Sequence, residues 1–440
     1  MSRLWTVLAA AAALQAGGAF AQDAPQDAAL EAAVKADYDA NLAALFDDFH
    51  QHPELSGLEV RTSGVVADQL EALGYQVTRG VGGHGVVAVM RNGQGPTILV
   101  RADMDGLPIE EASGVANPSR ARQVDSDGVE KPVMHACGHD VHVTALIGTA
   151  RQLAARRDRW SGTLVLVGQP AEERIFGARA MMQDGLYERF PKPDYAVAFH
   201  VSSGLESGKV VVPLGAAYSS SDSVDIRVHG VGAHGASPHK GIDPVLIASQ
   251  IVVSLQSVVS RTVDPLQGAV ITVGSIHGGI KHNIIPETVD LQLTVRSDDP
   301  EVRTQLLDGV DRVARGTALA LGVPEDKLPT VTRSTVETTP PTVNDAASAQ
   351  RVRDALIAGL GADRVVDKPR EGMGAEDFSY FITPETGVKG VYFAVGGTPA
   401  GQVDTAPSHH SPLFRIEPEP AVRSGVEATV TAVEALAPRA

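Results

Sequence analysis

The pattern of apolar positions predicts an α/β architecture over most of the chain. Three short runs, Thr97–Val100, Thr163–Val167 and Tyr195–Phe199, are apolar without alternation. Such runs are expected for strands buried on both faces of a largely parallel sheet. Helical periodicity separates them, at about 141–157 and 178–184. Strands that alternate with helices in this way predict a parallel sheet with helices on its faces.

The pattern changes near residue 221. Residues 224–228 and 289–295 alternate between apolar and polar side chains, so one face of each strand is expected to meet water. Helices are predicted at about 243–260, with Asp243 as N-cap, and at about 300–321. With a last strand at 330–332, the order is βαββαβ, which predicts a smaller α+β domain.

The α/β pattern resumes from Asp345, with a helix to Gly359, a strand at Val391–Val395 and a helix at about Pro418–Leu436. One larger domain interrupted by a smaller one is the simplest account. The expected division is a signal peptide at 1–21, a first catalytic part at 22–220, the insertion at 221–336 and a second catalytic part at 337–440.

The first residues are typical of an export signal. Arg3 is followed by the apolar run Leu4–Leu14 and by the small-x-small sequence Ala19–Ala21. The alternative is a membrane anchor, but the run is shorter than the ~20 residues that a spanning helix needs. We expect cleavage after Ala21, a periplasmic or secreted protein, and no membrane-spanning segment in the mature chain.

Composition narrows the chemistry. The 440 residues carry a formal net charge of −16, which argues against nucleic-acid binding because that requires a basic face. Fourteen histidines accompany a single cysteine, Cys137, which cannot form an intramolecular disulfide. Metal or acid–base chemistry is therefore favoured over a disulfide framework.

Polar side chains follow each of the three predicted strands. Asp103 and Asp105 follow the first strand, Glu172 and Glu173 the second, and His200 the third. Ligands of open α/β sheets bind at the carboxyl ends of the strands, so these side chains are expected to converge. Any one of them alone would be interpreted as a solvated carboxylate or a core histidine.

Two further segments carry metal-type ligands. Cys137 and His139 form a Cys-x-His pair before a predicted helix, a pair that favours zinc and tolerates manganese or cobalt. The alternative for Cys137 is a buried structural thiol. Near the C-terminus, His409 and His410 lie in a predicted loop that could deliver a last ligand.

Taken together, these segments resemble the M20 metallopeptidases, in particular the amidohydrolase branch, subfamily D, with its hippurate hydrolases, auxin-conjugate hydrolases and related carboxypeptidases. The resemblance covers nearly the whole chain after the predicted signal. It rests on motifs at His52–Ser56, Arg101–Asp105, Met134–Asp140, Gln169–Glu173, Gly232–His239, Asn283–Pro286, Gly374–Phe378 and His410–Pro412.

The resemblance implies a centre of two divalent metal ions beside a general base, Glu172. Many members of the wider family have histidine at the position of Asp103, but the amidohydrolase branch shares the acidic residue, and its metal set resembles one that uses Cys137 and His139. Asp103 and Asp105 are therefore expected to orient ligands rather than to bind metal. Glu172 would take a proton from water and pass it to the leaving amine. The implied ligands are Cys137, His139, Glu173, His200 and His410.

The inserted domain is expected to supply substrate contacts. By resemblance, His234 stabilises an oxyanion after domain closure or from a partner subunit. Asn283 and Arg296 are similar to residues that hold the free carboxylate of the substrate. The alternatives are a turn histidine for His234 and a solvated strand arginine for Arg296. No role is derived for the Gly374–Phe378 motif.

The sequence thus predicts metal-dependent hydrolysis of the amide bond of N-acyl amino acids or small peptides. The alternatives are a metallo-aminopeptidase or dipeptidase, and a non-catalytic periplasmic binding protein on the same scaffold. A homodimer through the inserted domain is a further expectation. The glycine-rich segment Gly80–Gly85 matches a dinucleotide-binding fingerprint, but a strand-like sequence follows it, so we interpret it as a strand connection.

Overall fold

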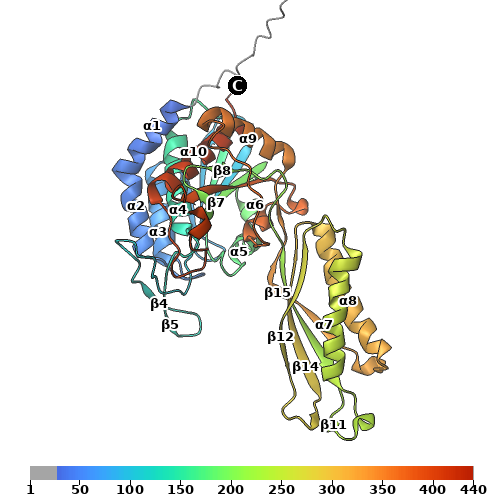
Figure 1. Cartoon of the computed structure of the whole chain (residues 1–440). Helices are drawn as coiled ribbons and strands as arrows, with labels where there is room; N and C mark the ends of the chain where they lie inside the picture. The colour runs from blue at the N-terminus through green and yellow to red at the C-terminus, as the bar shows by residue number, and fades with distance from the viewer. Residues whose placement is uncertain (1–26, 440) are drawn as a thin grey trace, which may run out of the picture.

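The structure is a computed structural model, and it describes residues 27–439. The predicted export signal lies outside these residues. Figure 1 shows a large α/β body and a slender body that projects from it. We call Ser221–Thr339 the inserted domain and the remainder the large domain.

A seven-stranded sheet forms the centre of the large domain, in the order β1-β2-β6-β3-β7-β17-β8. The inner strands β6, β3, β7 and β17 are mutually parallel, β2 and β8 join them antiparallel, and β1 pairs antiparallel with β2 at the edge of the sheet. The predicted α/β fold class is thereby confirmed. The strands are β1 (Gln76–Val81), β2 (Gly85–Asn92), β3 (Thr97–Asp103), β6 (Gly162–Gln169), β7 (Tyr195–Glu206), β8 (Val210–Val211) and β17 (Lys389–Thr398).

Helices cover both faces of this sheet, which explains why its strands are apolar without alternation. In β3, Ile98 and Val100 enter one apolar core, and Leu99 enters the core on the opposite face. The helical segments are α1 (Ala28–Asp37), the π-helical turn η1 (Tyr38–Leu42), α2 (Ala43–Gln51), α3 (Val60–Ala72), α4 (His139–Ala155), α5 (Gly177–Gln183), α6 (Leu186–Arg189), α9 (Ala346–Leu360) and α10 (Pro418–Leu436).

The inserted domain has an antiparallel sheet in the order β12-β14-β10-β15, with two helices on one face (Figure 1). Its apolar core is separate from the cores of the large domain. The βαββαβ order is confirmed, and the last strand continues past the predicted boundary at 336. The elements are β10 (Ser221–His229), α7 (Pro244–Thr262), β12 (Ala269–Gly278), β14 (Thr288–Ser297), α8 (Pro300–Ala320) and β15 (Thr330–Thr339).

Helix α7 begins where the sequence predicts. The Asp243 side chain accepts the N–H of Val245 at 2.9 Å, as an N-cap residue does. By length and composition this helix could also cross a membrane, which we did not anticipate from the sequence: its mean hydropathy over 18 residues is 1.3. Ile247 and Ile251 pack into the core of the inserted domain. The helix therefore covers a sheet.

A two-stranded ribbon of β11 (Ala233–His234) and β13 (Ile284–Ile285) forms the end of the inserted domain that lies farthest from the large domain (Figure 1). The glycine-rich segment Gly80–Gly85 connects the antiparallel strands β1 and β2, so the interpretation as a strand connection is confirmed. Smaller pairs are β4 (Arg122–Val124) with β5 (Glu130–Pro132), and β9 (Ala216–Tyr218) with β16 (Thr342–Val343).

Candidate metal centre

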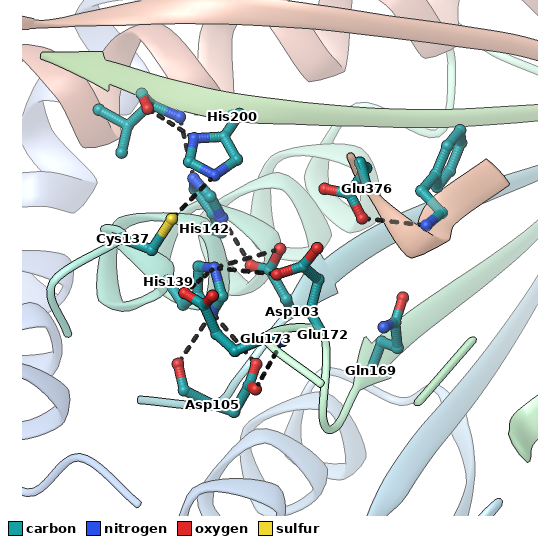
Figure 2. A network of polar contacts seen from close by, with 12 residues as sticks. Asp103, Asp105, Cys137, His139, His142, Gln169, Glu172, Glu173, His200 and Glu376 are labelled. Atoms are coloured by element: carbon teal, nitrogen blue, oxygen red, sulfur yellow. Dashed lines mark hydrogen bonds and ion pairs between the residues drawn. The ribbon is translucent and has the colours of Figure 1, made fainter. Parts of the chain in front are cut away.

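Metal-type side chains meet at the carboxyl ends of three neighbouring parallel strands (Figure 2). Asp103 is the last residue of β3, and Glu172 and Glu173 lie in the loop after β6. His200 lies within β7, which continues to Glu206. Cys137 and the first turn of α4 reach the same place from the side. The sequence-based expectation that these residues converge agrees with this geometry.

The five predicted ligands form one cluster. The sulfur of Cys137 is 3.4 Å from Nε2 of His200 and 3.3 Å from Nε2 of His410. The Glu173 carboxylate lies 3.3 Å from Nε2 of His410 and 3.8 Å from Nε2 of His139. His410 adopts a positive φ of 63°, and its N–H donates to the carbonyl of Ala136, which fixes the loop against the Cys137 segment.

The donor atoms fit a metal centre. Ligand atoms of Cys137, His139 and His200 lie within 4.8 Å of one another, and so do those of Cys137, Glu173 and His410. Nε2 of His139 and Oε1 of Glu173 are buried without a hydrogen-bond partner among the described residues. Buried polar atoms are normally satisfied, so a missing partner is implied here. A mixed sulfur, nitrogen and oxygen set suits zinc-type ions.

The two predicted orienting aspartates, Asp103 and Asp105, form hydrogen bonds with residues in and beside the cluster. Asp105 accepts the N–H of Glu173 at 3.0 Å, and its carboxylate is 3.2 Å from Nδ1 of His139. Asp103 is 2.6 Å from Nδ1 of His142. Nε2 of His142 accepts the N–H of Val201 at 2.9 Å, so neither nitrogen of His142 is free to bind a metal. Contacts of this kind fix the orientation of ligand side chains.

A buried charge network lies beneath the site; its members belong to three of the motifs named above, but the sequence did not indicate that they meet. Arg101 donates to Gln169 and Asp103, both at 2.7 Å, and to Glu376 at 2.8 Å. Gln169 in turn donates to Asp377 at 2.6 Å. We call these five residues the Arg101 cluster. The cluster gives the Gly374–Phe378 motif a role, because Glu376 and Asp377 connect the last part of the chain to β3 and β6.

The electrostatics of the site reflect its excess of buried carboxylates. Burial raises the pKa of Glu172 well above its ordinary value, and Glu376 and Glu173 add to the shift. Burial, Glu173 and Glu172 likewise raise the pKa of the Cys137 thiol. Burial lowers the pKa of His139, but Asp103 and other carboxylates outweigh it and raise the value to about 10. A bound cation favours the opposite, deprotonated forms of Glu172 and Cys137.

The remaining predicted residues lie away from the cluster. His234 is exposed in β11, and Asn283 is beside it, because its carbonyl accepts the N–H of Gly235 at 2.9 Å. Arg296 is near the other end of the inserted domain, where it donates to the carbonyl of Met373 at 2.8 Å. The structure therefore does not bring His234 and Asn283 to the cluster, and it separates Asn283 from Arg296.

The whole arrangement has counterparts among solved structures. The chain aligns over 90% of its length with 98% of the crystal structure of a dinuclear metal-binding peptidase of the M20 family from Bacillus subtilis, with a TM-score of 0.73 and 27% identity. The fold and the cluster thus define a class of protein, the two-domain metallohydrolases.

Sequence comparison defines the family. The model of peptidase family M20/M25/M40 matches residues 99–435. Thermostable carboxypeptidase 2 of Saccharolobus solfataricus is 36% identical over 366 residues, which is 82% of this chain and 87% of that protein. Hippurate hydrolase of Campylobacter jejuni is 36% identical over 333 residues, 76% of this chain and 82% of that protein. The chain belongs to this peptidase family, and it is a metal-dependent hydrolase that acts on amide bonds.

Proposed function

We propose that the protein hydrolyses the amide bond of N-acyl amino acids or small peptides and releases an amino acid with a free carboxylate. The observation that carries this proposal is the position of Glu172 beside the five-residue cluster, with Oε2 3.9 Å from Nε2 of His139. Relatives named as a hippurate hydrolase and as a carboxypeptidase support the substrate class.

We infer that the cluster holds two divalent ions, with zinc as the native metal and manganese or cobalt as alternatives. When bound, such ions supply Lewis acidity, which polarises a carbonyl group and lowers the pKa of a water molecule. Asp103 and Asp105 would keep the ligand side chains in position. The ligands in this proposal are Cys137, His139, Glu173, His200 and His410.

In the proposed reaction Glu172 moves the proton. Its carboxylate takes a proton from the attacking water and delivers it to the nitrogen of the leaving amine. Both carboxylates lie beside His139, but Glu173 also reaches His410, whereas Glu172 lies near Glu376 and Asp377. Neighbouring carboxylates can therefore serve different roles, one binding metal and one transferring protons.

The experiment that tests the mechanism compares Glu172→Gln with Glu173→Gln. Glu172→Gln should keep the metal content of the wild type and lose about 10²- to 10⁴-fold in kcat, because a general base contributes that much. Glu173→Gln should lose metal as well as activity. Metal analysis and turnover of a benzoyl-amino acid are measured on the same samples. A fully active Glu172→Gln enzyme would rule out the mechanism.

Substrate recognition is proposed to involve the inserted domain. Arg296 is half-buried, and burial lowers its pKa because it disfavours an unpaired cation, so a carboxylate bound beside the guanidinium would be stabilising. His234, the proposed oxyanion stabiliser, and Asn283 must reach a metal centre through domain closure or from a second subunit. A panel of acetyl-, benzoyl- and indoleacetyl-amino acids, measured beside unblocked dipeptides, tests the substrate class. Cleavage of the blocked substrates supports the proposal, and cleavage of unblocked dipeptides alone would favour an aminopeptidase or dipeptidase. Activity on none of them would favour a binding protein.

A homodimer through α7 is the proposed assembly. No charged residue lies between Asp243 and Arg261, although Leu246 and Val253 are 52% and 68% exposed. The exposed positions of the neighbouring helix α8 include several charged residues, as is usual for a helix that faces water. Val253→Lys should convert a dimer into a monomer in light scattering, and a monomeric wild type would contradict the proposal.

Export is proposed from the first 21 residues alone. N-terminal sequencing of the protein from the periplasm or the medium should begin at Gln22. A cytoplasmic protein that retains Met1 would contradict this proposal.

A further inference from the structure

Glu59 occupies the N-cap position of α3 but does not cap this helix. At such a position a side-chain oxygen normally accepts an N–H of the first turn. Here the N–H groups of Arg61 and Thr62 donate to the Glu54 carboxylate instead, at 3.0 and 2.7 Å. The Glu59 side chain, which is 0% exposed, is therefore available for another contact.

That contact is with the loop that carries the proposed general base. Oε1 of Glu59 accepts the N–H of Ala171 at 2.8 Å and the N–H of Gly57 at 2.8 Å. Ala171 directly precedes Glu172, and it has a φ of 52°, in the left-handed region that residues other than glycine rarely adopt. This conformation persists only where surrounding contacts enforce it.

The energetics of Glu59 favour a functional role over a packing role. A carboxylate without solvent exposure is costly, and Oε2 of Glu59 has no hydrogen-bond partner among the described residues. Burial and the nearby Asp105 raise the pKa of Glu59 to about 8. An apolar side chain would fill the same space without this cost, but it could not accept the Ala171 N–H.

We propose that Glu59 is a positioning residue that holds the left-handed turn at Ala171, so that Glu172 and Glu173 point to the reacting water and to the metal site respectively. This inference rests on the proposed roles of these two glutamates. It assigns a role to the segment that follows the His52–Ser56 motif. The consequence is that catalytic geometry depends on a residue that touches neither metal nor substrate.

The test uses Glu59→Met, which keeps the side-chain volume but has no carboxylate. The left-handed conformation costs alanine about 1–2 kcal/mol, so loss of the acceptor should lower kcat about 5- to 30-fold with little change in KM. Ala171→Gly removes that cost, because glycine adopts positive φ freely. The double variant Glu59→Met/Ala171→Gly should therefore return to within about threefold of Ala171→Gly alone.

Glu54→Met is the matched control. It removes the carboxylate that caps α3, so it should lower the melting temperature but leave kcat of the metal-loaded enzyme unchanged. Glu59→Gln keeps an acceptor oxygen and should retain most of the activity. If Glu59→Met does not fold, Glu59→Asp, which keeps a carboxyl group but is one methylene shorter, replaces it in the same comparisons.

Two results would overturn the proposal. One is a wild-type kcat in Glu59→Met; the other is a loss of kcat in Glu59→Met that the additional change Ala171→Gly does not restore. The outcome is distinguishable from a failure of the proposed function. If Glu172→Gln is inactive and the Glu59 variant is fully active, the mechanism stands and only the positioning role is wrong. If Glu172→Gln is active, the proposed role of Glu172 is wrong, and the positioning role of Glu59, which rests on it, is wrong as well.

Discussion

At the scale of single residues, Arg101 is the cation that compensates the buried carboxylates Asp103, Glu376 and Asp377. Its side chain is fully buried, and it donates to Asp103 and Glu376. Arg101→Met should lower the free energy of unfolding by about 3–5 kcal/mol, because removing one partner leaves buried carboxylates without compensation. Urea unfolding monitored by circular dichroism measures the change.

A surface arginine provides the comparison. Arg227 forms an exposed ion pair with Asp290 across the strands of the inserted domain. Exposed pairs contribute little, so Arg227→Met should leave the unfolding midpoint almost unchanged. Equal losses for the two variants would show that the Arg101 cluster does not stabilise the fold.

His50 gives a prediction for pH. Burial lowers its pKa, but the hydrogen bond with Asp140 at 2.8 Å and the Glu111 carboxylate at 3.4 Å outweigh this effect and raise the pKa from 6.5 to about 10. The folded state therefore binds the extra proton between these values. The contribution of protonated His50 to the free energy of unfolding is complete below about pH 6.5. Above that value it falls by about 1.4 kcal/mol per pH unit, and it is lost as the pH passes 10.

The measurement is the unfolding free energy from pH 6 to pH 10 for the wild type and for His50→Gln. The difference between the two proteins should shrink steadily as pH rises. His52→Gln, at an exposed side chain nearby, should follow the wild-type curve. A constant difference for His50→Gln would show that His50 is not protonated in the folded protein.

The residue scale also shows what sequence could predict. Cys137 and His139 are recognisable because they are close together in the chain, and Glu172, Glu173 and His200 because they follow apolar strands. The contact of Arg101 with Glu376 joins residues 275 positions apart, and nothing local in the sequence indicates it. Glu59 is similar, since a glutamate at a helix start is ordinarily interpreted as a favourable charge near the positive end of the helix dipole.

At the scale of elements, hydrophobic periodicity predicted which segments are helices and which are strands better than it predicted where each one begins and ends. The last helix, Pro418–Leu436, has the predicted bounds, and α4 begins two residues before the predicted Val141. The third strand was expected to end near His200 but continues to Glu206, because it keeps pairing with β17 as far as Thr398. Pairing with a distant strand is not visible in local hydrophobic pattern.

Helix caps give a prediction at this scale. Asp299 accepts the N–H groups of Glu301 and Val302 at 2.8 and 3.0 Å at the start of α8. Asp299→Ala should destabilise the inserted domain by about 1 kcal/mol, whereas Asp299→Asn, which keeps a good capping oxygen, should change it much less. Urea unfolding of the two variants checks this, and an equal effect of both would show that capping is not the cause.

At the scale of the whole molecule, the inserted domain has an apolar core of its own, which implies that it and the large domain are two cooperative units. The core of the inserted domain shares no residue with the cores of the large domain. Calorimetry should therefore resolve two transitions. Added zinc should raise the melting temperature of only the transition that belongs to the large domain. At a zinc concentration of 100 times the dissociation constant, the large domain should be stabilised by about 2.7 kcal/mol.

Chelator-treated protein is the reference for that experiment, and a parallel shift of both transitions would contradict the assignment of the metal to the large domain.

The fold class and the order of elements followed from sequence, whereas the spatial relation of the two domains did not. The place of His234 at the far end of the inserted domain depends on how that domain projects, which no local pattern encodes.

The inserted domain leaves and rejoins the large domain through a single pair of residues. Ser221 is directly opposite Thr339 in the antiparallel ladder of β10 and β15, a separation of about 4.5–5.5 Å between Cα atoms. A short glycine linker across that gap would close the chain with the seven-stranded sheet undisturbed. The fold is thus modular: the projecting part can change in length and sequence while the chain path of the large domain, which carries the metal cluster, stays the same.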